Sequence, residues 1–211
     1  MKGVLNKSFR EWPGGLVIGV TGGIASGKSE VGRILTDNGV DVCDTDAVAH
    51  AMIEPGGPAY DDVIRQFGRD IVGGDGHIDR GRLGERVFGD ATERERLNRI
   101  VHPHVRRAWT AWVARTRERN RVGALLIPLL FEVGAEKDVD TVWCVTAPEE
   151  QIYERLAQRG LTREQARARI ASQMPLAEKV RRADYVLENN DTRKTLKEET
   201  QKLLETVLGR R

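Results

Sequence analysis

A glycine-rich run near the start of the sequence has the residue types and the spacing of a phosphate-binding loop. Residues 22–29 read Gly-Gly-Ile-Ala-Ser-Gly-Lys-Ser and match the pattern G-x-x-x-x-G-K-[ST] in full. Glycines let the backbone wrap a phosphate chain, and the N-terminus of a following helix adds partial positive charge. Lys28 can reach the β- and γ-phosphates, and the Ser29 hydroxyl can bind Mg²⁺. The run predicts binding of a nucleoside triphosphate; a glycine-rich turn without a ligand is the alternative.

Two carboxylates follow the next expected strand. Asp44 and Asp46 bracket Thr45 directly after the apolar run 40–43. Ligands of an open parallel sheet bind outside the carboxyl ends of its strands, so these acids and the glycine-rich loop are expected at one crevice. A carboxylate there can accept a proton from an acceptor hydroxyl or help to hold Mg²⁺ through water. Helix N-capping is the alternative, but two acids exceed what a cap needs, which favours a catalytic role.

Arginines recur at helical spacing in the C-terminal half. Arg155 and Arg159 are four residues apart in one expected helix and therefore share a face, and Arg163 and Arg167 repeat this spacing in the next. The ordinary interpretation of such helices is a solvated charged face. In a kinase, however, a mobile lid closes over the phosphates and brings guanidinium groups to the transition state. We expect at least one of these arginines to act in catalysis.

Two further runs have a less definite role. His102-Pro103-His104 interrupts a helical stretch. It indicates a helix boundary or part of a substrate pocket, because further ligands for a two-histidine metal site cannot be placed. Pro128-Leu129-Leu130-Phe131-Glu132 ends an apolar run and forms either core or the floor of an acceptor pocket. No ligand is assigned to the tryptophans, which are Trp12, Trp109, Trp112 and Trp143.

These groups need a scaffold, and strands alternate with helices along the chain. Short apolar runs predict strands at 16–20, 40–43, 122–130, 140–146 and 185–187. Helices are expected at 28–37, 47–53, 59–67, 80–88, 92–119 with a break at His102-Pro103, 148–159, 162–173, 176–182 and 192–208. Thr162 and Gln165 have the spacing of a capping box. The pattern predicts an α/β fold of the P-loop NTPase type, with a parallel five-stranded sheet flanked by helices.

The lengths of the connections divide this single domain. The helical block at about 59–119 is too long for a simple crossover between strands, so it indicates an inserted helical subdomain. A smaller helical insertion at about 160–182 is the candidate lid. The core then comprises about 16–58, 120–160 and 183–211.

Composition excludes several classes of protein. The 211 residues are 39% hydrophobic and 31% charged, which is too apolar for a disordered chain and too polar for a membrane-embedded one. Basic residues number 34 against 32 acidic ones, and a protein coated for nucleic acid is usually far more basic. Cys43 and Cys144 lie in strand-like runs without a CxxC partner, and residues 1–15 lack the apolar stretch of a secretory signal. A cytoplasmic protein with two core cysteines is expected.

The order of these motifs resembles the dephospho-CoA kinase family of P-loop kinases. The similarity runs from about Leu16 to the C-terminus. Its most specific part is the phosphate-binding loop followed by the Asp-x-Asp, His-Pro and Pro-Leu-Leu runs. The matching pieces are residues 20–29, 44–46, 76–80 with Leu83, Val87 and Phe88, His102-Pro103, 128–132, Gln151, Arg155, Arg159, Arg169-Ile170, Gln173, Ala183-Asp184 and Asn189-Asn190.

The resemblance implies transfer of a phosphoryl group from ATP to the 3′-hydroxyl of dephospho-CoA, with Mg²⁺, in a core, a helical CoA-binding part and a lid. It assigns catalysis to Asp46 as the activating carboxylate and to Lys28, Arg155 and Arg159, and metal binding to Ser29. The implied ATP-binding residues are Gly23, Ile24, Ala25, Ser26, Gly27, Lys28, Ser29, Glu30 and Asn189. The implied substrate-binding residues are Thr21, Asp44, His102, Pro128 and Leu129.

Two positions depart from the pattern of this family. Glu30 stands where the family usually has Thr, and Gly160 stands where Asp or Asn often follows the arginine. A second hydroxyl contact to the α-phosphate and the stiffness of the lid hinge are therefore in question.

A nucleoside or sugar kinase is the nearest alternative, and a P-loop switch or motor is the alternative from another class. The guanine-reading Asn-Lys-x-Asp of GTPase switches does not occur in the sequence, and residues 128–132 match poorly the acidic pair of motor ATPases. We therefore expect a small-molecule substrate and no nucleic acid, membrane or obligate protein partner.

Overall fold

The computed structural model describes residues 15–88 and 90–209. This part of the chain forms two compact units: the sheet unit, residues 15–44 and 113–209, and the helical unit, residues 45–112. The sequence-based statements on a secretory signal at residues 1–15 and on Trp12 fall outside the described residues, except for Gly15. Within the described ranges no helix has both the length and the apolar character of a membrane span.

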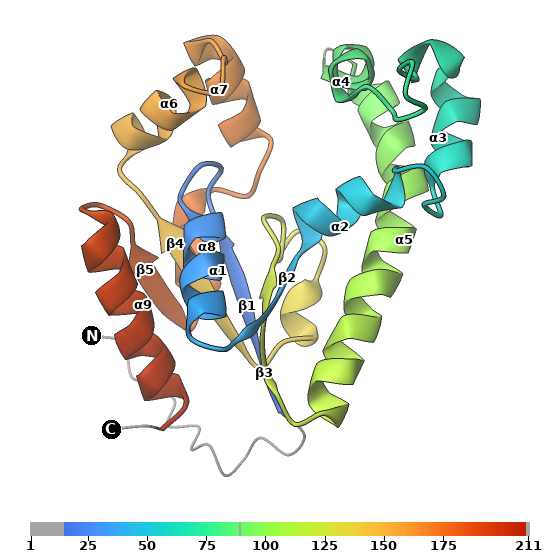
Figure 1. Ribbon diagram of the computed structural model, residues 1–211. Helices are drawn as coiled ribbons and strands as arrows, with labels where there is room; N and C mark the ends of the chain where they lie inside the picture. The colour runs from blue at the N-terminus through green and yellow to red at the C-terminus, as the bar shows by residue number, and fades with distance from the viewer. Residues whose placement is uncertain (1–14, 89, 210–211) are drawn as a thin grey trace. The chain divides into compact units, whose positions relative to one another are not determined.

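The sheet unit is built on five parallel strands (Figure 1), which confirms the predicted fold class. Their order across the sheet is β2-β3-β1-β4-β5, so the strand that leads into the glycine-rich loop is central. The seven residues of this strand are all buried, as a strand covered on both faces requires. The strands are β1 (Leu16–Gly22), β2 (Asp41–Asp44), β3 (Val122–Leu126), β4 (Thr141–Thr146) and β5 (Tyr185–Glu188).

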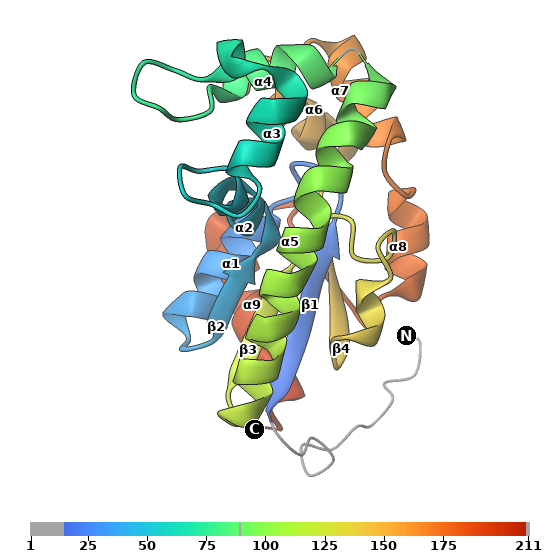
Figure 2. The same ribbon diagram turned by 90° about the vertical axis from the view of Figure 1, so that its right-hand side faces the viewer.

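Helices cover both faces of this sheet. Leu16, Ile18 and Val20 point to the face where α1 (Lys28–Asp37) and α9 (Arg193–Val207) pack, and all share one apolar cluster. The short helix α8 (Leu176–Arg182) packs against β1 and β4. Figure 2 shows that α8 and α1 lie on opposite faces of the sheet.

The helices α6 (Glu149–Ala157) and α7 (Arg163–Ala171) form a separate small cluster. It contains Ile152, Leu156 and Ala166, and Ile24 and Ala25 of the glycine-rich loop pack against it. The capping box is confirmed, because Gln165 N–H donates to the Thr162 hydroxyl and the Thr162 N–H donates back to the Gln165 side chain. The region expected as a lid thus contains one helix packed beside α6 and one packed on the sheet.

The helical unit has a core of its own. Val63 and Phe67, one turn apart, are buried together with Ile71 and Leu83. The four-residue spacing gives the helix at Tyr60–Phe67 one apolar face. Its elements are α2 (Thr45–Met52), α3 (Tyr60–Phe67), the 3-10 turn η2 (Arg69–Ile71), α4 (Arg80–Phe88) and α5 (Ala91–Glu118), whose last residues from 113 belong to the sheet unit.

Two sequence-based expectations about prolines were wrong. The helix predicted to break at His102-Pro103 is continuous, since α5 contains Pro103. A proline inside a helix removes one hydrogen bond, but the buried stripe of Val101, Val105, Trp109 and Val113 stabilises the helix through this point. The strand predicted to reach Leu130 ends at Leu126, because Pro128 has no N–H for the ladder.

Candidate active site

The glycine-rich loop is closed by tight backbone packing. Gly22 has a φ of +148°, and a Cβ added there would lie 2.2 Å from the Val145 carbonyl oxygen of β4. Gly27 has a φ of +109°, and its added Cβ would lie 2.3 Å from the amide nitrogen of Asn189. That same amide donates a 2.8 Å hydrogen bond to the Ser26 carbonyl. Side chains are therefore excluded at Gly22 and Gly27 by shape as well as by conformation.

The loop ends in an open helix N-terminus. Gly27 is the N-cap of α1 and supplies no side-chain cap, and the first N–H groups of a helix have no partner inside it. Ala25 adopts a left-handed φ of +56°, unusual for a residue with a side chain. The buried Ser26 hydroxyl has no hydrogen-bond partner within the described residues. Donors and a helix dipole thus converge where an anion would complete them, as a phosphate site requires.

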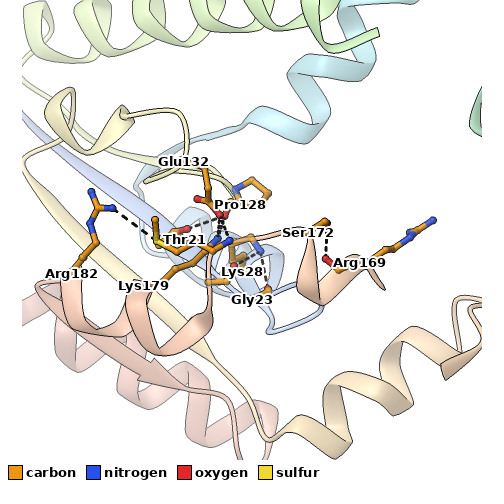
Figure 3. Close-up of polar contacts among 11 residues, drawn as sticks. Thr21, Gly23, Lys28, Pro128, Glu132, Arg169, Ser172, Lys179 and Arg182 are labelled. Carbon is orange, nitrogen blue, oxygen red and sulfur yellow. Dashed lines mark hydrogen bonds and ion pairs between the residues drawn. The ribbon is translucent and has the colours of Figure 1, made fainter. Parts of the chain in front are cut away.

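Lys28 lies over this loop. Its ammonium donates to the Gly23 carbonyl at 3.1 Å and to the Gly22 carbonyl at 3.5 Å, as Figure 3 shows for Gly23. The side chain is held by loop carbonyls and is only half-buried. A cation in this position is available for the phosphates of a nucleotide.

Only one of the two lid arginines assigned to catalysis reaches the loop. Arg155 of α6 donates to the Ala25 carbonyl at 3.0 Å and to the Gln151 side chain at 3.0 Å. Arg159 is exposed and lies two residues beyond the end of α6, so the predicted shared helical face is not formed. Gly160 follows with a φ of +80°, a conformation that Asn and Asp also adopt more readily than other residues. The turn after Arg159 is therefore kept despite the departure at Gly160.

The strand register brings Asp44 toward the loop. Asp44 pairs with Leu126 of β3, and Leu126 pairs with Val20 of β1, one residue before Thr21. Asp44 therefore stands two strands away from the start of the loop, at the same edge of the sheet. Asp46 is exposed and belongs to α2, in the helical unit.

The other predicted substrate residues fall into two groups. Thr21, Pro128 and Leu129 lie at the sheet edge, where the Thr21 hydroxyl donates to the Pro128 carbonyl at 3.2 Å. Leu129 directly follows Pro128 in the sequence and is half-buried. His102 is exposed on α5 and belongs to the helical unit.

A buried lysine that sequence reasoning missed adjoins this edge. The Lys179 ammonium donates to the Pro128 carbonyl at 2.6 Å and pairs with Glu132 at 2.9 Å, with none of its side chain exposed (Figure 3). Burial raises the pKa of the Glu132 carboxyl, but hydrogen bonds from Lys179 and from the Met174 N–H outweigh it and lower that pKa below its usual value. The available signal was position: Leu176, Lys179 and Val180 have the i, i+3, i+4 spacing of a buried stripe.

Glu30, expected as a departure from the resembled pattern, has a structural role. Its carboxylate pairs with Arg33 at 2.5 Å and with Arg193 at 2.5 Å, which links α1 to the start of α9. Its charge is therefore balanced by two guanidinium groups close to the phosphate-binding loop.

The donor set at the sheet edge fits Mg²⁺. Ser29 and Asp44 offer a hydroxyl and a carboxylate, the oxygen ligands that this ion prefers. Among the residues that the structure describes, no three His, Cys, Asp or Glu side chains gather as a metal site. Mg²⁺ in nucleotide enzymes usually relies on substrate phosphates and water besides one or two protein ligands, so a full protein cage is not needed.

Comparison with known proteins finds one family repeatedly. The family model for dephospho-CoA kinase matches residues 16–195. The dephospho-CoA kinase of Geobacillus kaustophilus is 46% identical over 195 residues, which cover 92% of this chain and 95% of the relative. That of Carboxydothermus hydrogenoformans is 42% identical and is covered to 93%, with 90% of this chain.

Solved structures agree with this family. The Thermus thermophilus protein TT1252 superposes with a TM-score of 0.72 and 36% identity, covering 92% of this chain and 98% of its own. The dephospho-CoA kinase of Campylobacter jejuni gives 0.65 and 25%, covering 90% and 96%. The shikimate kinase of Acinetobacter baumannii, at 0.54 and 15%, covers 96% and 98% and shares the fold alone. With the family model and close relatives spanning nearly its whole length, this chain belongs to the dephospho-CoA kinase family.

Proposed function

We propose that this protein transfers the γ-phosphoryl group of ATP to the 3′-hydroxyl of dephospho-CoA, which yields ADP and CoA and completes coenzyme A synthesis. The observation that carries this proposal is the loop of residues 22–29. It combines an uncapped helix N-terminus, an unpartnered buried Ser26 hydroxyl and the Lys28 ammonium in a chain of this family. A family member without such a loop would have no place for the donor phosphates.

The loop residues bind and polarise the donor. Backbone N–H groups from Gly23 to Ser29 hold the phosphate oxygens, and Lys28 balances the charge that spreads over the transferred group. One terminal nitrogen of the Arg155 guanidinium group donates to the Ala25 carbonyl of the loop. The other donates to the Gln151 side chain, which orients the group. Arg159 adds a guanidinium group when the α6–α7 region closes. Asn189 contributes to the ATP site by shaping the loop, since its amide donates to the Ser26 carbonyl and lies against Gly27.

Asp46 activates the acceptor. The 3′-hydroxyl oxygen attacks the γ-phosphorus, the bond between this phosphorus and the β,γ-bridging oxygen breaks, and ADP leaves. The proton of the hydroxyl passes to the Asp46 carboxylate. Orientation of the hydroxyl contributes together with proton removal, because phosphoryl transfer depends mostly on positioning and charge stabilisation. Thr21, Pro128, Leu129 and His102 bind the acceptor.

The Ser29 hydroxyl and the Asp44 carboxylate would hold Mg²⁺, the carboxylate by way of water. The ion, when bound, neutralises charge that develops on the β- and γ-phosphate oxygens.

A cytoplasmic location and the absence of an obligate protein partner remain part of the proposal.

The test is ADP release by the purified protein with ATP, Mg²⁺ and single acceptors. Dephospho-CoA should give ADP in equal amount to phosphorylated acceptor, while adenosine and small sugars should give little above background. ADP release without any phosphorylated acceptor would indicate a switch or motor ATPase. Faster turnover of a sugar or nucleoside would move the chain to another kinase activity.

A further inference from the structure

Lys179 occupies the one position of α8 that is fully buried, and a buried ammonium needs compensation for its lost hydration. Two acceptors provide it: the Pro128 carbonyl at 2.6 Å and the Glu132 carboxylate at 2.9 Å. Both belong to the short segment that follows β3. Lys179 therefore clamps this segment at two points, one at each end of residues 128–132.

Each acceptor has a second donor from another part of the sheet unit. The Pro128 carbonyl also accepts from the Thr21 hydroxyl, directly before the phosphate-binding loop. The same Glu132 oxygen that pairs with Lys179 accepts from the Met174 N–H at 2.9 Å, between α7 and α8. A carbonyl or carboxylate oxygen has two lone pairs, so both oxygens are fully used. The network joins Thr21 before the loop, residues 128–132 (the acceptor-side segment) and Met174 after α7, and Figure 3 labels Thr21, Pro128, Glu132 and Lys179 of it.

α8 packs against β1, the strand that leads into the phosphate-binding loop, and its Leu176 lies near the second residue of that loop. A Cβ added to Gly23 would lie 3.9 Å from the methyl carbons of Leu176, which is ordinary contact distance. A shift of α8 would therefore change its packing on β1, its bond to Pro128 and, through Glu132, the position of Met174. An apolar residue would fill this buried position at no desolvation cost, yet it could not fix these three segments by directed bonds.

We propose that Lys179 is a positioning residue of the phosphoryl transfer, which holds the acceptor-side segment and, through Glu132, the α7–α8 link in one arrangement around the phosphate-binding loop. This inference rests on the proposed function. Positioning errors of about 1 Å can lower a rate by about 100-fold even when no reacting group is lost. Loss of the network should therefore lower kcat by roughly 10- to 100-fold and leave ATP affinity within about threefold.

The decisive variant is the double substitution Lys179→Met with Glu132→Gln. It removes both charges, so no unpaired ion is left buried, and it breaks the tie between α8 and the α7–α8 link while Gln fills the space of Glu. Arg181→Met is the matched control, since Arg181 also lies on α8 but forms an exposed pair with Glu178. Lys179→Met alone serves as the second variant if the double variant does not fold, since the Glu132 side chain is 23% exposed and water can solvate its charge. All rates are expressed per ATP-binding site counted by calorimetry.

We expect the double variant to keep a melting temperature near that of the wild type while kcat falls as stated. Hydrogen exchange of the peptide around Met174 should become faster, and Arg181→Met should change neither. If the double variant has both the kcat and the melting temperature of the wild type, the inference is wrong, because the ion pair then contributes nothing to positioning. Unchanged exchange around Met174 would overturn it as well. If the wild type itself does not phosphorylate dephospho-CoA, the proposed function fails, and the exchange measurement still tests the network.

Discussion

Both units carry exposed ion pairs, but the sheet unit also buries polar side chains beside the phosphate-binding loop. In the sheet unit the polar side chains of Ser26, Lys179 and Asn189 are buried and lie in or against the loop and strand ends. In the helical unit the ion pairs are exposed, such as Glu54 with His77 at 2.6 Å and side chains 41% and 55% exposed. Exposed pairs contribute little to stability, whereas buried polar groups must keep their partners. We therefore expect substitutions in the sheet unit to change chemistry and those in the helical unit to change acceptor affinity.

Asp46 is the expected exception to this division, because it belongs to the helical unit but is proposed as the catalytic carboxylate. Asp46→Asn keeps the shape and removes the charge, so kcat should fall by about 10²- to 10⁴-fold with little change in ATP affinity. Asp44→Asn should have a smaller effect. The measurements are kcat for dephospho-CoA and ATP binding by calorimetry. If Asp46→Asn keeps more than about a third of kcat, the assignment is wrong; if Asp44→Asn is the inactive one, the roles are exchanged.

Lys28 tests the sheet-unit side. Lys28→Ala removes one preorganised cation at the phosphates, and such losses lower kcat by about 10²- to 10³-fold. The fold should be unchanged, because Ala suits the first turn of α1 and the lysine is only half-buried. Circular dichroism checks the fold and the coupled ADP assay checks turnover, with Lys202→Ala, at an exposed position of α9, as the control. Wild-type turnover in a folded Lys28→Ala variant would contradict the assignment of this loop as the phosphate-binding site.

His102 sharpens the comparison within the helical unit. His102→Ala should raise KM for dephospho-CoA by roughly 2- to 10-fold, the value of one hydrogen bond, and leave KM for ATP unchanged. His104→Ala is the matched control, since a residue two positions along a helix points to another face. An equal rise in both variants, or a rise in KM for ATP, would contradict a role for His102 in acceptor binding.

The cysteines report whether the sheet unit is as closed as its packing indicates. Burial raises the pKa of the Cys43 thiol to about 11, with a smaller contribution from Asp44, and burial likewise raises the pKa of Cys144 to about 11. Because the thiolate is the reactive form, both should be nearly inert to Ellman's reagent in the native protein at about pH 8. They should react fully in denaturant, and the native rate should rise with pH. Rapid native labelling would show that the strands open readily.

The phosphate-binding loop could be predicted because its chemistry is local: eight consecutive residues specify backbone shape, cation and hydroxyl. The hydrogen bond from Asn189 to the Ser26 carbonyl could not, since it joins positions 163 residues apart through strand pairing. Strand β3 was predicted too long because apolar character continues past Pro128, where the hydrogen-bond ladder cannot. Lys179 was not predicted as a buried residue either. Lysine is ordinarily a surface residue, and only the segment after β3 supplies the acceptors that permit its burial.

The most direct test of the account is the identity of the product. Purified protein, ATP, Mg²⁺ and dephospho-CoA should yield a compound that carries one additional phosphoryl group and coelutes with authentic CoA in liquid chromatography with mass detection. Its formation should match ADP release mole for mole and should be lost in the Asp46→Asn and Lys28→Ala variants. ADP release without that compound, or phosphorylation at a position other than the 3′-hydroxyl, would contradict the proposed reaction.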